Sequence, residues 1–307
     1  MDAATGPILI AGANGHLGRR LLARLSGTGA GARALVRSAR AARTIREDRL
    51  EPEIAVADYS DAEALRGAFA GCGGLVHLVG ILKEGPTTSY RAAHEETSTR
   101  FANAAAAAGV ERIVYLSILG ADPDSPNACL ASKGRAERIL LDGPVSAVVI
   151  RLPMVLGPGD FASAALRGQA LAGVLPLVRG GATLEQPIDA EDVATAVEQA
   201  LGAPGLAGQA IDLAGPECLS HRTLVLRAAA LHGRRPRILP LPYGLMRLAV
   251  SLLARVSKYP PISPPMLEVL EHDDRVDAVA AAKRLGISLT PLDETLRRCV
   301  GPQAEAA

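Results

Sequence analysis

Three glycines recur at every third position near the start of the chain, in the stretch AGANGHLG: Gly12, Gly15 and Gly18. They follow an apolar run at 7–12, and we expect a helix to begin near His16. Glycine at this spacing permits a tight turn, lets a pyrophosphate approach the backbone and allows close helix–strand packing. The first amides of such a helix also bind phosphate. The motif predicts a dinucleotide site rather than a merely structural turn. The expected contacts are Gly12, Asn14, Gly15, His16, Leu17 and Gly18.

The next expected strand ends at Arg37 and Ser38 instead of a carboxylate. Asp or Glu at this position would bond the ribose 2′-hydroxyl of NAD, whereas Arg accommodates the 2′-phosphate of NADP. We therefore expect NADP(H) to be favoured over NAD(H), although a solvated basic helix start gives the same pattern. Asp58 closes the third strand, where it contacts the adenine amino group or caps the helix starting near Asp61. Tyr59 beside it is placed in the cofactor site as well.

The first half of the chain alternates short apolar runs with helix-like stretches. The runs, at 7–12, 32–37, 53–58, 74–80, 112–117 and 146–151, are rich in Val, Ile and Leu. Continuous apolar runs are typical of strands covered on both faces, so an α/β fold with a doubly wound parallel sheet is expected. We expect a nucleotide-binding domain over 1–155. A smaller C-terminal α/β domain on the substrate side is expected over 156–307, interleaved with the core.

Composition excludes several classes of function. The net charge of +1 and an aromatic content of 3% argue against a nucleic-acid binder. The four cysteines form no CxxC pair, which favours reduced thiols and a cytoplasmic protein over a disulfide framework or a metal site. The N-terminal residues show no signal peptide, and no apolar run reaches the ~20 residues that span a bilayer.

The chain resembles the extended or atypical short-chain dehydrogenases/reductases, within the NAD(P)-binding Rossmann superfamily. Besides the glycine motif, the shared stretches are VAD (56–58), LVHLVG (75–80), GVERIVYLS (109–117), RLPMVLGPGD (151–160) and QPIDAEDVA (186–194). HLVG, LEQPIDAEDVA and RLGISLTPLDETLR look most like the branch that contains the NADPH-holding accessory subunit of respiratory complex I. The resemblance implies that Leu78, Gly80, Lys133, Pro153 and Val155 contact the cofactor.

The family's chemistry uses a Tyr four residues before a Lys, with a Ser on a neighbouring strand end. By position, Ser117 matches the serine and Lys133 the lysine, but the tyrosine position holds Cys129. The resemblance leaves three interpretations of Cys129: a small buried residue without turnover, a thiolate favoured by Lys133, or a site where another group moves the proton. The groups considered for that role are Tyr90, Tyr115 and His77.

Because Cys129 stands where the family has its tyrosine, the sequence favours two classes of function and leaves a third less favoured. The first is an NADPH-binding reductase of a small apolar carbonyl or quinone-related compound. The second is a non-catalytic, nucleotide-bound structural or assembly protein that contacts a membrane complex and has no substrate. The less favoured third is a nucleotide-sugar epimerase or dehydratase, whose relatives depend on the same Tyr. The sequence does not specify an oligomeric state.

The segment 242–258 is expected to form an unusually apolar helix. Arg247, Ser251, Arg255 and Lys258 make one narrow polar stripe, and the rest is mainly Leu, Val and Met. Such a helix is buried, lies on lipid or lines an apolar substrate site. We expect burial in the C-terminal domain, while the basic stripe permits peripheral contact with an anionic membrane.

Overall fold

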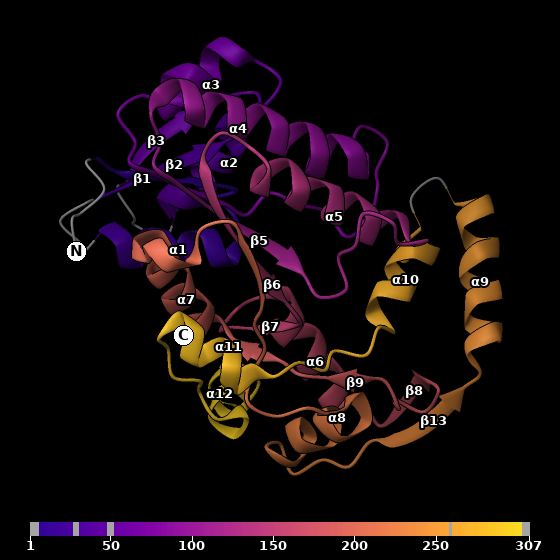
Figure 1. Cartoon of the computed structure of the whole chain (residues 1–307). Coiled ribbons are helices and arrows are strands. Elements are labelled where there is room, and N and C mark those ends of the chain that lie inside the picture. The colour runs from indigo at the N-terminus through magenta and orange to yellow at the C-terminus, as the bar shows by residue number, and fades with distance from the viewer. Residues whose placement is uncertain (1–5, 27–30, 48–51, 258–259, 303–307) are drawn as a thin grey trace. The chain divides into compact units, whose positions relative to one another are not determined.

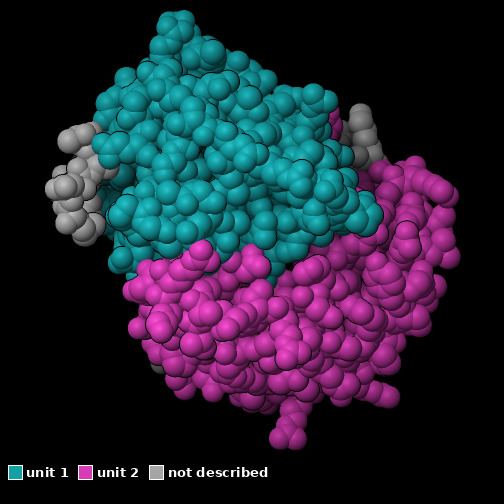
Figure 2. Space-filling model, viewed as in Figure 1, with its two compact units in different colours: residues 1–84, 88–151, 194–211 teal, residues 85–87, 152–193, 212–307 magenta. Residues whose placement is uncertain are grey.

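The computed structural model describes residues 6–26, 31–47, 52–257 and 260–302. The chain divides into two compact units, coloured separately in Figure 2. Unit 1 comprises Met1–Glu84, Thr88–Arg151 and Ala194–Ile211, and unit 2 comprises Gly85–Thr87, Leu152–Val193 and Asp212–Ala307. The sequence-based boundary between residues 155 and 156 stays a prediction.

Unit 1 is built on a seven-stranded sheet in the order β11-β6-β5-β4-β1-β2-β3. The strands are β1 (Ile8–Ala11), β2 (Ala32–Val36), β3 (Glu53–Val56), β4 (Gly74–His77), β5 (Arg112–Ile118), β6 (Ser146–Leu152) and β11 (Gln209–Asp212). Strand β1 pairs in parallel with both β2 and β4. All six expected strands are present, and the doubly wound parallel α/β fold is confirmed.

Helices connect these strands and cover the sheet. They are α1 (His16–Ser26), α2 (Ala39–Glu47), α3 (Ala62–Phe69), α4 (Thr97–Ala108), α5 (Ala128–Leu141) and α7 (Ala190–Gly202). Helix α4 packs between α3 and α5 (Figure 1). The core beneath them includes the fully buried side chains of Leu9, Phe69, Phe101 and Tyr115. Arg24 of α1 forms an ion pair with Glu198 of α7 at 2.6 Å.

Unit 2 combines three two-stranded sheets with helices. The strands are β7 (Val155–Leu156), β8 (Val174–Val178), β9 (Leu184–Glu185), β10 (Ile188–Asp189), β12 (Leu219–Ser220) and β13 (Arg237–Leu241). The helices are α6 (Phe161–Leu171), α8 (His221–Ala230), α9 (Tyr243–Val256), α10 (Pro264–Leu270), α11 (Ala278–Leu285) and α12 (Leu292–Cys299). Leu156, Leu166, Leu224 and Leu296 meet in one buried cluster.

The expected burial of the segment 242–258 is wrong for helix α9. Val250 is its one buried residue, and most of its leucines are exposed. An apolar face does not determine what covers it, so the composition alone could not distinguish burial from a surface position. Lys258 lies outside the described residues. No helix in the described part of the chain is long and apolar enough to cross a bilayer.

Candidate active site and cofactor cradle

The glycine turn follows strand β1 directly and leads into helix α1. Gly12 has a φ of +81°, which an L side chain rarely adopts, and its carbonyl accepts a hydrogen bond from the Gly15 amide at 3.1 Å. A Cβ on Gly18 would lie 2.6 Å from the Gly12 oxygen, so only glycine lets the helix approach the turn this closely. The first turn of α1 contains no acidic residue. The bare turn and the free amides expected at a helix start fit a pyrophosphate.

Tyr59 and Leu78 lie against this turn, as their assignment to the cofactor site requires. Burial raises the pKa of the Tyr59 phenol to about 12, and a hydrogen bond with the Gly12 backbone partly opposes the shift. The Tyr59 ring also packs edge-on against Phe101, with centroids 5.1 Å apart. A Cβ on Gly12 would stand 3.3 Å from the Leu78 carbonyl carbon. The structure therefore brings Gly12, Tyr59 and Leu78 together.

The ends of β2 and β3 carry the groups expected near the adenosine half of a cofactor. Arg37 is exposed, and Ser38 accepts a hydrogen bond from the Ala41 amide at the start of α2. Asp58 accepts hydrogen bonds from the Ser60 amide and hydroxyl, both at 2.8 Å. These bonds lower the pKa of Asp58, and the charges of Arg100 and Arg37 lower it further.

The alternative role of Asp58 as the cap of α3 is wrong. Asp61 performs that role, because its Oδ1 accepts from the Glu63 and Ala64 amides at 3.0 Å each. The carboxylate of Asp58 makes a local turn instead, and it is exposed beside the charge of Arg37.

Lys133 is a buried ammonium with two partners on strand β5. Its Nζ donates to the Tyr115 hydroxyl at 2.8 Å and to the Leu116 carbonyl at 2.9 Å. Burial lowers the pKa of Lys133 to about 8, although the Glu137 carboxylate opposes this shift. Glu137 is itself held by Arg151, with an ion pair at 2.6 Å. A lysine with a pKa this near neutrality can give up or take a proton under ordinary conditions.

Ser117 follows Tyr115 by two residues on β5, so both side chains lie on the same face of the strand. The Ser117 hydroxyl is buried, and it has no hydrogen-bond partner among the described residues. A buried polar group without a partner is unfavourable, and such groups are rare in folded proteins. This orphaned hydroxyl fits a site in which a carbonyl oxygen accepts the missing bond.

Cys129 is a fully buried thiol at the start of α5. Its Sγ donates to the Ile81 carbonyl at 3.7 Å, and burial raises the pKa of the thiol to about 11 despite the nearby charge of Lys133. The helix start itself is capped by Asn127, whose Oδ1 accepts from the Cys129 amide at 2.9 Å. A thiol with this pKa stays protonated at neutral pH, so the thiolate interpretation does not fit the structure.

His77 and Tyr90 are both used in structural hydrogen bonds. His77 Nδ1 accepts from the Val79 amide at 3.2 Å, which leaves its Nε2 to donate to the Ser98 hydroxyl at 3.2 Å. The Tyr90 hydroxyl donates to the Leu82 carbonyl at 2.9 Å. Of the three side chains considered as substitutes for the missing tyrosine, Tyr115 is the one held by Lys133.

Sequence reasoning missed His94, which lies on a π-helical segment at Arg91–Glu96. Its Nε2 accepts from the Ile81 amide at 3.1 Å, while its Nδ1 is buried without a hydrogen-bond partner among the described residues. A Cβ on Gly80 would lie 3.4 Å from Lys133 Nζ and 3.6 Å from His94 Nε2. Glycine therefore keeps the space beside both side chains open, and no periodicity in the sequence indicates this.

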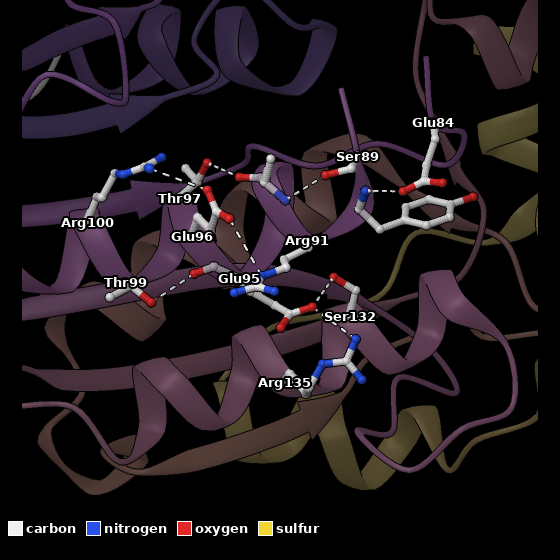
Figure 3. Close-up of polar contacts among 12 residues, drawn as sticks. Glu84, Ser89, Arg91, Glu95, Glu96, Thr97, Thr99, Arg100, Ser132 and Arg135 are labelled. Carbon is white, nitrogen blue, oxygen red and sulfur yellow. Dashed lines mark hydrogen bonds and ion pairs between the residues drawn. The ribbon is translucent and has the colours of Figure 1, made fainter. Parts of the chain in front are cut away.

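Polar contacts fasten the π-helical segment to α5 (Figure 3). Glu95 accepts from the Ser132 hydroxyl at 2.8 Å and from Arg135 at 3.0 Å. At the start of α4, the Thr97 hydroxyl donates to the Ala92 carbonyl of the segment at 2.8 Å. Since Ser132 is adjacent to Lys133, these contacts help to hold the lysine in position. π-helical turns are frequent at functional sites.

Pro153 and Val155 belong to unit 2, so their contact with a cofactor stays a prediction. Val155 forms strand β7, which pairs in parallel with Ile188 of β10. The carbonyl of the intervening Met154 accepts from the Ile188 amide at 3.0 Å.

The parallel sheet, with a glycine turn between its strand β1 and helix α1, defines a dinucleotide-binding protein of the Rossmann type. The chain belongs to the NAD(P)H-binding family, whose sequence pattern it matches over residues 12–204.

Reductases and a respiratory subunit are similar to this chain. The ceramide reductase of Caulobacter vibrioides is 28% identical over 240 residues, covering 78% of this chain and 74% of the relative. The (4-alkanoyl-5-oxo-2,5-dihydrofuran-3-yl)methyl phosphate reductase of Streptomyces griseus is 30% identical, covering 83% and 82%. Subunit 9 of the mitochondrial NADH dehydrogenase (ubiquinone) 1 alpha subcomplex from Arabidopsis thaliana is 27% identical, and this chain spans 55% of its length.

A solved structure confirms the fold. The triphenylmethane reductase of Citrobacter sp., determined with NADP(H), superposes with a TM-score of 0.73 at 20% identity, covering 95% of this chain and 99% of that one. The expected resemblance to atypical short-chain dehydrogenases/reductases, including the complex I branch, is confirmed by these comparisons.

Proposed function

We propose that the protein is an NADPH-dependent reductase of an apolar carbonyl or quinone-related compound. The observation that carries this proposal is the buried Lys133 ammonium, which pairs with the Tyr115 hydroxyl on the strand face that also carries the unpartnered Ser117 hydroxyl. A structural role does not require an unpartnered hydroxyl on the strand face whose tyrosine binds a buried ammonium, whereas carbonyl reduction uses both groups.

Tyr115 takes over from the tyrosine that is missing at position 129. A phenol and an ammonium within hydrogen-bond distance are the pair that the family's chemistry uses, and here β5 supplies the phenol instead of α5. Ser117 binds the carbonyl oxygen, and the Tyr115–Lys133 pair delivers the proton that this oxygen gains. NADPH, when bound, supplies the hydride. Of the three Lys133 protons, two are directed to Tyr115 and Leu116, and the third can bind a ribose hydroxyl.

The preference for NADPH over NADH rests on the exposed Arg37 at the end of β2. An arginine side chain pairs with the 2′-phosphate that distinguishes NADPH from NADH. Ser38 follows Arg37 at this strand end, and its hydroxyl caps α2. The carboxylate of Asp58 faces the same region and is available to the adenine amino group. An apolar substrate is supported by the ceramide reductase relative, whose named substrate is a lipid.

The test follows NADPH oxidation with a panel of long-chain ketones and quinones. Lys133→Met removes the ammonium and keeps the length of the side chain, so turnover should fall by at least about a hundredfold, the usual size of a general acid–base contribution. Nucleotide binding, measured by thermal stabilisation, should persist at least in part, since the glycine turn is intact. Turnover that is equal in the Met variant would refute the assignment.

A non-catalytic, nucleotide-bound role in a membrane complex is the second candidate. The buried, protonated Cys129 and the likeness to a subunit of mitochondrial NADH dehydrogenase favour it. It predicts stabilisation by NADPH, no turnover of any added carbonyl, and co-purification with membrane proteins. The epimerase or dehydratase alternative predicts tightly held NAD instead, which mass analysis of freshly purified protein would detect.

A further inference from the structure

Helix α9 of unit 2 presents an apolar stripe to solvent. Leu245, Leu248, Leu252 and Val256 recur at intervals of three and four residues, so they lie on one face of the helix. Their exposed fractions run from 49% at Leu252 to 84% at Val256. The buried Val250 lies on the other side, and within unit 2 the helix packs against α10 (Figure 1). An exposed apolar surface of this kind marks an interaction site.

The chain around this stripe is basic and lacks carboxylates. No Asp or Glu occurs between Glu217 and Glu268, while that interval contains eight Arg and Lys residues. Arg255 of α9 is exposed beside the stripe, and Arg247 is exposed about 100° around the helix from Leu248. Three more exposed arginines lie just before or at the start of β13, at positions 234, 235 and 237. The charged side chains of residues 234–257 are thus all basic, while the neighbouring helix α10 carries Glu268.

We propose that this α9 surface, defined as residues 234–257, docks on an anionic membrane. Leucines on one face of a helix can enter the boundary between headgroups and acyl chains, while arginines reach the phosphates with their long stems. A helix of 14 residues is about 21 Å long, which suits a position in the plane of the membrane. Each basic residue near an anionic surface adds to the attraction.

Charge argues against a second copy of the chain as the occupant. A two-fold interface brings identical patches together, so the basic residues 234–257 of one copy would lie against the same basic residues of the other. No carboxylate lies within this stretch of sequence to neutralise them. An anionic lipid surface offers the complementary charge and an apolar layer at the same time.

The experiment is sedimentation of the full chain with vesicles. Phosphatidylcholine vesicles containing phosphatidylglycerol are compared with phosphatidylcholine alone at low and high salt. We expect binding to the anionic vesicles that weakens with salt. Leu248→Ser/Leu252→Ser and Arg247→Glu/Arg255→Glu should each weaken it by at least about tenfold. Arg43→Glu/Arg46→Glu on α2 makes the same change of charge at exposed positions in unit 1 and should leave binding unchanged.

Each variant is first shown to bind NADPH as the parent does, so that loss of folding is excluded. Equal binding to neutral vesicles, or no binding to either kind, would overturn the proposal. A dimer in sedimentation velocity that Leu248→Ser/Leu252→Ser dissolves would assign the surface to a second copy. An unchanged vesicle affinity with a raised KM for a long-chain ketone would assign it to substrate binding. Vesicle binding requires no turnover, so this test is independent of the proposed reductase activity.

Discussion

Tyr115→Phe removes one hydroxyl from the buried partner set of Lys133 and keeps the ring. The ammonium then retains the Leu116 carbonyl and loses a hydrogen bond of 2.8 Å. A hydrogen bond to a charged group contributes about 1.5–3 kcal/mol, and one pKa unit corresponds to about 1.4 kcal/mol. The loss should therefore lower the pKa of Lys133 by one to two units, from its present value of about 8.

The pH dependence of kcat reports this change. If protonated Lys133 is needed for proton delivery, kcat is constant at low pH and declines as the pH rises through the lysine pKa. In Tyr115→Phe the decline should begin one to two pH units lower, together with a fall in kcat of about a hundredfold or more. Tyr90→Phe is the matched control, since the Tyr90 phenol donates to the Leu82 carbonyl. The pH dependence of kcat in Tyr90→Phe should be the same as in the parent.

The lowered pKa of Lys133 in the parent protein also makes the stability of the fold depend on pH. Lys133 has a pKa of about 8 in the folded protein against 10.5 for the free side chain. Between these values the unfolded chain binds more protons, so the contribution of Lys133 to stability rises with pH from about 8 to about 10.5. An identical decline of kcat in Tyr115→Phe and the parent would refute the idea that this phenol acts on Lys133.

Three further variants test other parts of the site and fold. Gly18→Ala places a Cβ 2.6 Å from the Gly12 oxygen and 2.7 Å from the Ala13 Cα, so it should destabilise the protein by about 1–3 kcal/mol and abolish NADPH binding. Thermal unfolding with and without nucleotide measures both, and Gly67→Ala on α3, where an added Cβ would meet nothing within 4 Å, controls for the loss of a glycine. Arg37→Glu should reverse the preference to NADH, with a change of at least about tenfold in the ratio of the two dissociation constants, and an unchanged ratio would remove Arg37 from the cofactor site. Arg298→Ala leaves the buried Asp189 with Thr295 as its remaining side-chain donor, and should lower stability by about 2 kcal/mol after allowance for the partial exposure of the arginine. Urea unfolding measures that loss, and Arg297→Ala, which lies beside it on α12, should change stability little.

The sequence predicts the sheet and the glycine turn well because both depend on local patterns. Continuous apolar runs specify strands buried on both faces, and the spacing of Gly12, Gly15 and Gly18 specifies the turn. Strand β11 was not predicted, since Gln209–Asp212 is a short segment without an apolar run, and its pairing depends on β6. Local patterns do not contain that partner.

The contacts of the catalytic region are long-range, and this is why the sequence did not resolve them. Eighteen residues separate Tyr115 from Lys133, and their contact requires α5 to pack on β5. The space at Gly80 depends on three segments at once, because Lys133 and His94 both border it. Cys129 differs from these long-range contacts, because the replacement of the family's tyrosine by cysteine is visible in the sequence itself. The structure adds that the Cys129 thiol is buried.

The state of Lys133 also distinguishes the two candidate functions. Burial holds its pKa about 2.5 units below the value of a free lysine, which corresponds to about 3 kcal/mol of stability lost at neutral pH. Lys133→Met removes that cost, but it also takes away the donor of the Tyr115 hydroxyl and the Leu116 carbonyl, and a buried group left unsatisfied costs about 1–3 kcal/mol. The two effects oppose each other, so stability should change little in either kind of protein. A reductase should lose turnover in this variant, and a loss of turnover at unchanged stability would show that the buried charge is maintained for chemistry.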